Sequence, residues 1–373
     1  MASTLLIILY SLGLLALLGI AAVGALLWAR NLAQKHNRTL YKIRTPKGID
    51  CLEPVEIGGL KQWFHIRGRN IDNPVLLLLH GGPGLPNIGC FDEIQRPWEE
   101  YFTVVQWDQR HVGKSHDRPL QKAAQTVTME QLLNDTEEAI SYIRGYLGKE
   151  KIFIMGYSLG TYLGMKMVSN RPEWFHSYIG VGQTTNSVER VREEHALLLA
   201  DAKSKGNKAL ATKLEAMMPV PDPENKMRHS LTHGYYQWKE IFRSGLHEMS
   251  VEDWIALMRF GFLTSPHYTL SNLLHMPPSE YLVEGSKFCE EFMSLDLPAE
   301  VGPSFDVPII FLTGAHDCHI PYTLTDAWFK EIQAPYKEQI WLQDTSHFPF
   351  VSEPGKVLVA LVTKVLPLAK ENF

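Results

Sequence analysis

The hydrophobic and polar positions of this 373-residue chain follow two alternating patterns over most of its length. Short continuous apolar runs, such as Val75–Leu79 and Ile152–Met155, are typical of parallel strands that are buried on both faces. Residues 129–147 instead repeat apolar side chains at helical spacing. Further strands are predicted around 54–57, 62–67, 101–110, 177–183, 307–314 and 338–344, and further helices over about 159–169 and 354–369. The alternation predicts an α/β fold, with a mostly parallel sheet and helices on both faces.

The alternation is interrupted between about Asn186 and Glu300. This stretch is mostly helical in pattern, carries apolar and aromatic clusters, and contains no convincing strand. A helical segment that interrupts a sheet is best interpreted as a cap inserted into the core domain. We therefore predict a core in two parts, residues 30–185 and 301–373, and a helical cap over residues 186–300.

The first 29 residues predict a separate unit, because no charged side chain occurs from Leu5 to Trp28. This length spans a bilayer at roughly 20 residues per crossing, and Trp28 suits the membrane interface. Arg30, Lys35 and Arg38 follow, so the positive-inside rule places the catalytic domain in the cytosol. We predict a single-pass membrane helix with the lipid bilayer as its partner. A cleaved signal peptide is the alternative, although no Lys or Arg precedes the apolar run, which also exceeds a usual h-region of roughly 7 to 15 residues.

Composition and charge are those of a globular protein, with 45% hydrophobic residues, 21% charged residues and a net charge of −5. No basic tract with interleaved aromatic residues suggests a nucleic-acid partner. The four cysteines, Cys51, Cys90, Cys289 and Cys318, lack CxxC spacing. Free thiols are therefore expected, rather than a zinc ribbon or a disulfide framework.

The sequence GYSLG, residues 156–160, lies between a predicted buried strand and a predicted helix. In that context Gly-x-Ser-x-Gly is a nucleophile elbow, a strained turn that holds the serine hydroxyl clear of the backbone. Glycines are expected on both sides because a Cβ atom there would clash with the neighbouring strand and helix. The helix N-terminus supplies amide N–H groups and a positive dipole where an oxyanion would form. Ser158 is therefore the predicted nucleophile.

A nucleophilic serine needs a base, and the base needs an acid that orients it. In the chain order Ser, acid, His, the acid follows the next-to-last strand and the histidine follows the last one. Asp317 and His347 occupy these two positions and are the predicted acid and base. Asp344 is a rival acid that lies close to His347 in the sequence. His316 and His319, on either side of Asp317, are interpreted as loop residues.

The sequence HGGPG, residues 80–84, directly follows the apolar run Val75–Leu79. The second oxyanion donor of such hydrolases lies in this loop. We predict the N–H of Gly82 as that donor, with Gly81 as the second candidate, and the N–H of Leu159 as its partner. No metal ion and no organic cofactor is implied.

Taken together, the motifs HGGPG, WDQRHVGKS, GYSLG, GAHD and SHFPF resemble the α/β-hydrolases of the proline iminopeptidase group. The resemblance extends from about Glu53 to the C-terminus and is weak in the cap. It implies the same triad of Ser158, Asp317 and His347. It also implies a structural arginine, Arg110, that pairs within the network of the Asp-Gln-Arg loop.

The chain departs from that group at positions that bear on its substrate. His111 stands where the family peptidases usually have a glycine after the arginine. The family's cap usually contains a Trp-x-x-Trp-Glu run whose glutamate helps to hold the free amine of the substrate. Here the run YYQWKE has Lys239 at that position, with Glu240 next to it. The sequence does not reveal the orientation of the other acids of the cap, which include Glu193, Glu194 and Glu284.

These features predict a membrane-tethered serine hydrolase that cleaves an ester or amide bond in a small-molecule or short-peptide substrate through an acyl-enzyme. Epoxide hydrolases and dehalogenases are disfavoured because they place a carboxylate at the elbow, where this chain has Ser158. Within the class, a proline iminopeptidase-like aminopeptidase and an esterase or lactonase without aminopeptidase activity are both open. A catalytically silent, membrane-bound binding protein on the same fold is a third possibility.

Overall fold

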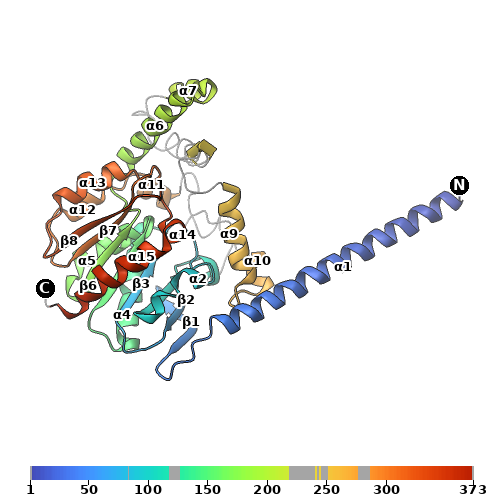
Figure 1. Ribbon diagram of the computed structural model, residues 1–373, viewed down its shortest axis with the longest axis horizontal. Coiled ribbons are helices and arrows are strands. Elements are labelled where there is room, and N and C mark those ends of the chain that lie inside the picture. Colours follow the sequence, from blue (N-terminus) through green and yellow to red (C-terminus); the bar gives the residue numbers. More distant parts are fainter. Residues whose placement is uncertain are drawn as a thin grey trace.

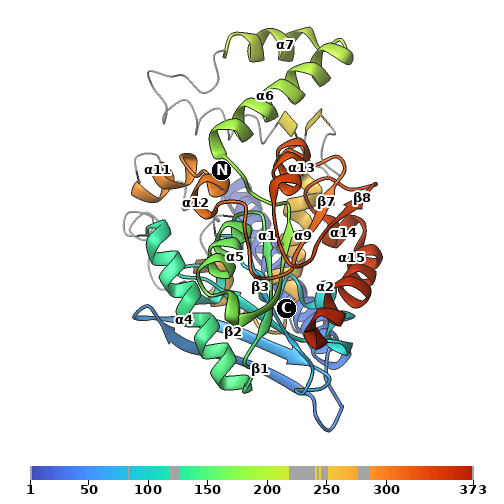
Figure 2. The same ribbon diagram turned by 90° about the vertical axis from the view of Figure 1, so that its left-hand side faces the viewer.

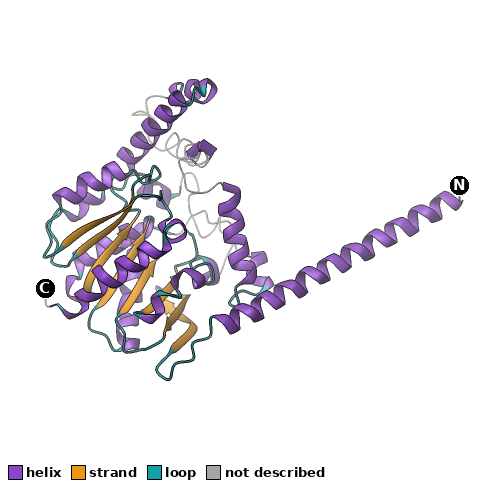
Figure 3. Ribbon diagram, in the orientation of Figure 1, coloured by secondary structure: helices purple, strands orange, loops and turns teal. Residues whose placement is uncertain are grey.

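An eight-stranded mixed sheet forms the centre of the computed structural model, which describes residues 2–82, 84–116, 127–217, 240–241, 243–244, 251–275 and 286–371. The strand order is β1-β2-β4-β3-β5-β6-β7-β8 (Figures 1 and 3). β2 runs antiparallel to β1 and β4, and all the other neighbouring strands are parallel. The strands are β1 (Ile49–Ile57), β2 (Leu60–Gly68), β3 (Val75–Leu79), β4 (Thr103–Asp108), β5 (Ile152–Tyr157), β6 (Phe175–Val181), β7 (Ile309–Gly314) and β8 (Lys337–Leu342). The predicted α/β class is confirmed.

The central strand β3 is apolar at every position because both faces of the sheet are covered. Side chains of a strand alternate between the two faces. In β3, Val75, Leu77 and Leu79 therefore join one buried cluster, whereas Leu76 and Leu78 join another.

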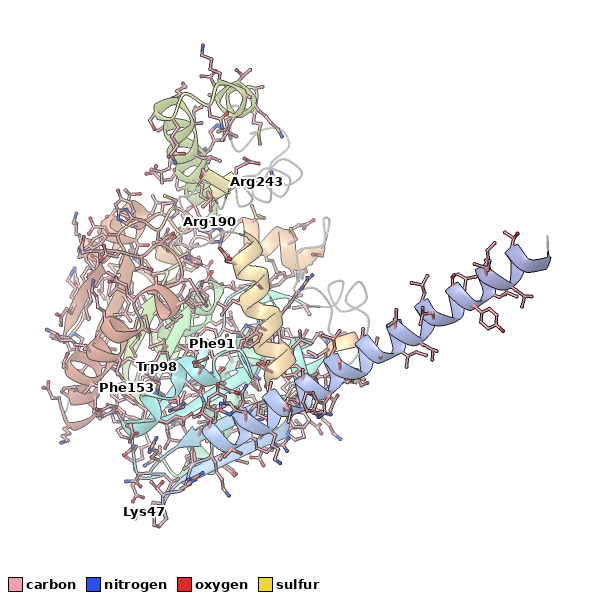
Figure 4. All side chains as sticks on the ribbon, turned by 45° about the vertical axis from the view of Figure 1, so that its right-hand side comes forward. Lys47, Phe91, Trp98, Phe153, Arg190 and Arg243 are labelled. Carbon is pink, nitrogen blue, oxygen red and sulfur yellow. The ribbon has the colours of Figure 1, made fainter. Side chains whose placement is uncertain are left out.

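Helices cover both faces of the sheet, and Figure 2 shows α4 and α5 on one side of the strands and α14 and α15 on the other. The first cluster includes side chains of α4 (Met129–Leu147), α5 (Leu159–Asn170) and α13 (Tyr322–Glu331). The second is covered by α14 (Pro349–Ser352) and α15 (Pro354–Ala360), and the short α2 (Asp92–Gln95) lies in the loop after β3. Phe91, Trp98 and Phe153 belong to this second cluster and lie in the body of the protein (Figure 4).

The predicted C-terminal helix is not continuous. α15 ends at Ala360, and the chain continues through a π-helical turn, Leu361–Val365, and a 3-10 turn, Leu366–Lys370. Pro367 explains the change, because proline donates no backbone hydrogen bond and its ring clashes with the carbonyl four residues earlier.

Between β6 and β7, the described residues form helices and loops, with one isolated bridge between Asn186 and Asp296. The helices are α6 (Ser187–Ser204), α7 (Lys208–Glu215), α9 (Val251–Thr264), α10 (Leu270–His275), α11 (Lys287–Met293) and α12 (Leu297–Val301). α6 and α7 project beyond the end of the sheet, and α9 and α10 lie beside α1 (Figure 1). Lys239 and Glu284 lie outside the described residues.

The N-terminal helix α1 (Ala2–Leu40) extends away from the body of the protein (Figure 1). Among the described residues it is the one helix long and apolar enough to cross a membrane, and its apolar segment is not buried. The helix continues past the predicted anchor of residues 1–29. In this extension, the side chains of Gln34 and Asn37 donate hydrogen bonds to the carbonyls of Ser265 (2.6 Å) and Thr264 (3.1 Å). The extension thus lies against the end of α9 and the turn that follows it.

Candidate active site

Ser158 occupies a strained turn between β5 and α5. Its φ is 51° and its ψ is −120°, a conformation that side-chain-bearing residues rarely adopt. Such strain persists only where the surrounding structure holds it. Here the Ser158 N–H donates to the carbonyl of Val181 at 2.9 Å, and the hydroxyl of Thr184 donates to the Ser158 carbonyl at 3.1 Å. The elbow expected from the sequence is present.

The two glycines of the elbow have the steric role that the sequence predicts. A Cβ atom on Gly156 would lie 2.5 Å from the carbonyl oxygen of Gly160 and 2.6 Å from the Cα of Thr161. A Cβ atom on Gly160 would lie 2.7 Å from the carbonyl carbon of Leu79. The missing side chains therefore let α5 start directly against β3 and β5.

Asp317 and His347 are in contact at the carboxyl ends of β7 and β8. The distance from His347 Nδ1 to Asp317 Oδ2 is 2.8 Å, and both residues are buried. The other carboxylate oxygen of Asp317 accepts the backbone N–H groups of His319 (3.0 Å) and Ile320 (2.9 Å). The rival acid, Asp344, has an exposed side chain that pairs with Lys356 at 3.5 Å. Asp317 is therefore the carboxylate in contact with His347.

The nucleophile elbow lies beside this pair. The ring of Tyr157, the residue before Ser158, has its centroid 5.2 Å from that of His347. A Cβ atom on Gly182 would lie 2.7 Å from His347 Cε1, and Gly182 directly follows Val181, whose carbonyl holds the Ser158 N–H. The pair of Asp317 and His347 and the elbow that carries Ser158 thus lie at neighbouring carboxyl ends of the parallel sheet.

The HGGPG loop also borders the elbow. A Cβ atom on Gly81 would lie 2.9 Å from the Cβ of Ser158, so the loop backbone passes close to the serine. Gly82 has a φ of 124°, which favours glycine. Leu159 is the first residue of α5, so its N–H has no acceptor within the helix. The backbone N–H groups of Gly82 and Leu159 therefore remain the candidate oxyanion donors.

His80 supports this loop in its neutral form. The backbone N–H of Gln109 donates to His80 Nε2 at 3.2 Å, so Nδ1 carries the proton and faces the Gly81 carbonyl at 2.9 Å. Complete burial lowers the pKa of His80 to about 4, in agreement with this assignment. A neutral imidazole therefore links the loop after β3 to the loop after β4.

Comparisons with known proteins agree with this architecture. Residues 74–204 match the family model described as the alpha/beta hydrolase fold. The protein has the α/β-hydrolase fold. The probable aminopeptidase YbaC of Bacillus subtilis (strain 168) is 27% identical over 316 residues, which cover 83% of this chain and 94% of that protein.

Two solved structures share this fold. A proline iminopeptidase-related protein from Thermus thermophilus has a TM-score of 0.58 and 18% identity, over 86% of this chain and 99% of its own. The proline iminopeptidase of Mycobacterium smegmatis has a TM-score of 0.56 and 18% identity, over 85% of this chain and 98% of its own. The resemblance to the proline iminopeptidase-like group is thus confirmed.

His319 is part of the site, although sequence reasoning interpreted it as a loop residue. Its ring packs edgewise on that of His347, with the centroids 4.7 Å apart. Its Nδ1 lies 3.3 Å from the buried carboxylate of Glu194 on α6, and Glu194 pairs with Arg190 at 2.6 Å. Figure 4 shows Arg190 where α6 meets the core. Burial lowers the pKa of His319. The Glu194 contact has no local sequence signal, because it depends on how α6 packs over the loop after β7.

Arg110 of the Asp-Gln-Arg loop has a structural role, but its partners lie outside that loop. Its Nε and one terminal nitrogen each lie 2.8 Å from an oxygen of Asp135 on α4. The same terminal nitrogen donates to the Gly58 carbonyl. His111 has a φ of 58°, so it adopts a conformation that the family's usual glycine would reach without strain.

Proposed function

We propose that the protein is a serine hydrolase that forms an acyl-enzyme on Ser158. The observation that carries the proposal is the 2.8 Å contact between His347 and Asp317 beside a strained serine elbow. In this mechanism His347 Nε2 accepts the serine proton, while Asp317 holds the imidazole tautomer and stabilises the imidazolium. The N–H groups of Gly82 and Leu159 stabilise the oxyanion, at roughly 3 kcal/mol for each donor. Water then releases the acyl group.

Glu194 is the candidate group for recognition of a substrate amine. It is buried, it contacts His319 beside the catalytic histidine, and its Oε2 has no hydrogen-bond partner among the described residues. A buried acceptor without a partner is costly, and a substrate ammonium would satisfy it. The relative YbaC, a probable aminopeptidase, supports the same substrate class. We therefore propose an aminopeptidase that acts on short substrates with a free N-terminus.

An esterase without aminopeptidase activity is the second candidate, and one observation favours it. Arg190 already pairs with Glu194, so the carboxylate is neutralised before any substrate arrives. A neutral pair attracts a cationic amine much less than an isolated carboxylate does. An ester substrate would need no charge at this position.

Three chromogenic substrates separate the candidates. These are prolyl p-nitroanilide, its N-acetylated counterpart, and p-nitrophenyl butyrate. An aminopeptidase cleaves the free-amine anilide and not the acetylated one, and Glu194→Gln raises KM for that anilide while leaving ester hydrolysis unchanged. An esterase cleaves the butyrate alone. Ser158→Ala should abolish every one of these activities. Wild-type rates of hydrolysis by Ser158→Ala would show that Ser158 is not the nucleophile.

We also propose that α1 anchors the protein in a membrane, with the catalytic domain on the cytosolic side. The support is a 35-residue candidate span of high mean hydropathy, none of whose apolar window is buried, followed by cationic residues. Alkaline carbonate should leave the full chain in the membrane fraction, and external protease should spare the domain in intact cells. N-terminal sequencing that finds the mature chain starting near residue 26 would instead show a cleaved signal peptide.

A further inference from the structure

A second cluster of chemically reactive side chains lies outside the Ser158 site. It consists of His65 on β2, Asp92 on α2 and His267 on the turn between α9 and α10. One nitrogen or oxygen atom from each residue lies within 4.8 Å of the other two. The His65 side chain is fully buried, that of Asp92 is 5% exposed and that of His267 is 16% exposed. None of the three has a role in the proposed serine chemistry.

Both imidazole rings of this cluster present a nitrogen atom to the Asp92 carboxylate. His65 Nδ1 lies 3.5 Å from Asp92 Oδ1, and His267 Nε2 lies 3.2 Å from Asp92 Oδ2. Among the described residues, His65 Nδ1 and both oxygens of Asp92 are buried atoms without a hydrogen-bond partner. A carboxylate with two unsatisfied buried oxygens is costly, so a ligand that satisfies it would stabilise the fold.

The separations agree with those around a metal ion. Ligands at about 2.1 Å from a tetrahedral Zn²⁺ ion are about 3.4 Å from one another. The two contacts, one to each oxygen of Asp92, lie close to that value, and one ligand atom from each residue lies within 4.8 Å of the other two. Two imidazole nitrogens and one carboxylate oxygen are a donor set that suits Zn²⁺ and similar divalent transition metals.

A neighbouring carboxylate orients the His65 ring. Asp50 Oδ1 lies 3.4 Å from His65 Nε2, and Arg67 holds the other Asp50 oxygen at 2.6 Å. When Nε2–H donates to Asp50, the lone pair of Nδ1 points toward Asp92. Carboxylate–histidine–metal relays of this kind fix the tautomer of ligating histidines.

We propose that His65, Asp92 and His267 bind one divalent transition-metal ion, best matched by Zn²⁺. The ion joins the core elements β2 and α2 to the turn between α9 and α10. Helix α1 is seated on the same turn, through Arg30, which donates to the Tyr268 carbonyl at 2.6 Å, and through Gln34 and Asn37. The metal site therefore links the turn that α1 contacts to the core of the protein. It is independent of hydrolase activity, so its test does not require a substrate.

The test measures metal content and stability of the full chain, purified in detergent with a tag that contains no histidine. After dialysis against Zn²⁺ and then metal-free buffer, the wild type should retain about one Zn²⁺ per chain by elemental mass spectrometry. His267→Gln should retain less than a tenth of that, whereas His36→Gln, which alters an exposed histidine of α1, should retain it all. Asp50→Asn should weaken Zn²⁺ binding about 10- to 100-fold.

Two measurements on the wild type do not depend on any variant folding. A strong chelator should lower Tm, and added Zn²⁺ should restore it. Co²⁺ loaded in place of Zn²⁺ should give visible absorption bands that His267→Gln loses. Wild-type protein that holds no metal and keeps its Tm in chelator would overturn the proposal, and the cluster would then be an ion-pair network of Asp92 and the two histidines. Equal Zn²⁺ retention by His267→Gln and His36→Gln would overturn it as well.

Discussion

Replacing Gly160 with alanine tests why the elbow needs glycine. Alanine in place of glycine within a helix ordinarily stabilises a protein by about 1 kcal/mol. At this position, however, the new Cβ would lie 2.7 Å from the Leu79 carbonyl carbon and 2.9 Å from the His80 carbonyl oxygen. Both neighbours are backbone atoms of β3 and of the loop that follows it, and they have no side-chain freedom with which to move away.

The steric cost should outweigh the gain in helix propensity. Ordinary van der Waals contact needs about 3.5 Å, so α5 and β3 must separate by almost 1 Å. Overpacking of this kind costs roughly 1–3 kcal/mol, which leaves a net loss of up to about 2 kcal/mol. The same shift moves Leu159 away from the position of the oxyanion, and a misplacement of 1 Å can cost on the order of 100-fold in rate.

Gly145→Ala is the matched control. Gly145 also lies in a helix, α4, but a Cβ there would meet nothing within 4 Å, so this variant should gain stability. Urea unfolding in detergent measures both changes, and initial rates of ester hydrolysis measure the effect on catalysis. The steric reasoning is refuted if Gly160→Ala is as stable and as active as the wild type, or if both variants gain stability alike.

Two further predictions concern buried ionisable groups. Arg110→Met removes the ion-pair partner of the buried Asp135 carboxylate, which then keeps, among the described residues, only its hydrogen bond from Gln62, and should lower the free energy of unfolding by about 3–5 kcal/mol. The double variant with Asp135→Leu should recover most of this loss, and no recovery in urea unfolding would contradict the pairing. Burial lowers the pKa of His80 from 6.5 to about 4, so between these values the unfolded chain binds more protons and stability falls as the pH falls, by on the order of 3 kcal/mol. His80→Gln should reduce this slope in unfolding measured between pH 7 and 4, and an unchanged slope would show that His80 is not buried in its neutral form.

Local patterns in the sequence sufficed to predict the sheet, and the proposed triad rests on the same patterns. Parallel strands that are buried on both faces tend to be continuously apolar, so β3 and the first four residues of β5 can be recognised from their own residues alone. The positions of Ser158, Asp317 and His347 follow from chain order, because the ends of successive parallel strands meet at one edge. The steric need for Gly156 and Gly160 follows from the same turn.

The remaining features depend on contacts between distant parts of the chain. Glu194 contacts His319 only because α6 packs over the loop after β7. The pattern of hydrophobic residues in the sequence does not predict that packing. The cluster of His65, Asp92 and His267 joins residues about 200 positions apart. Helix α1 runs eleven residues beyond the predicted anchor, because its polar end binds the turn after α9. By contrast, Pro367 was a visible local signal that the C-terminal helix would be interrupted.

The central claim is that His347, oriented by Asp317, makes the hydroxyl of Ser158 nucleophilic. The most direct measurement is the mass of the full-length protein after exposure to a fluorophosphonate at neutral pH. We predict a single adduct that peptide mapping places on Ser158, that Ser158→Ala does not form, and that forms far more slowly in Asp317→Asn. Folded wild-type protein that stays unlabelled, or an adduct located on another residue, would contradict it.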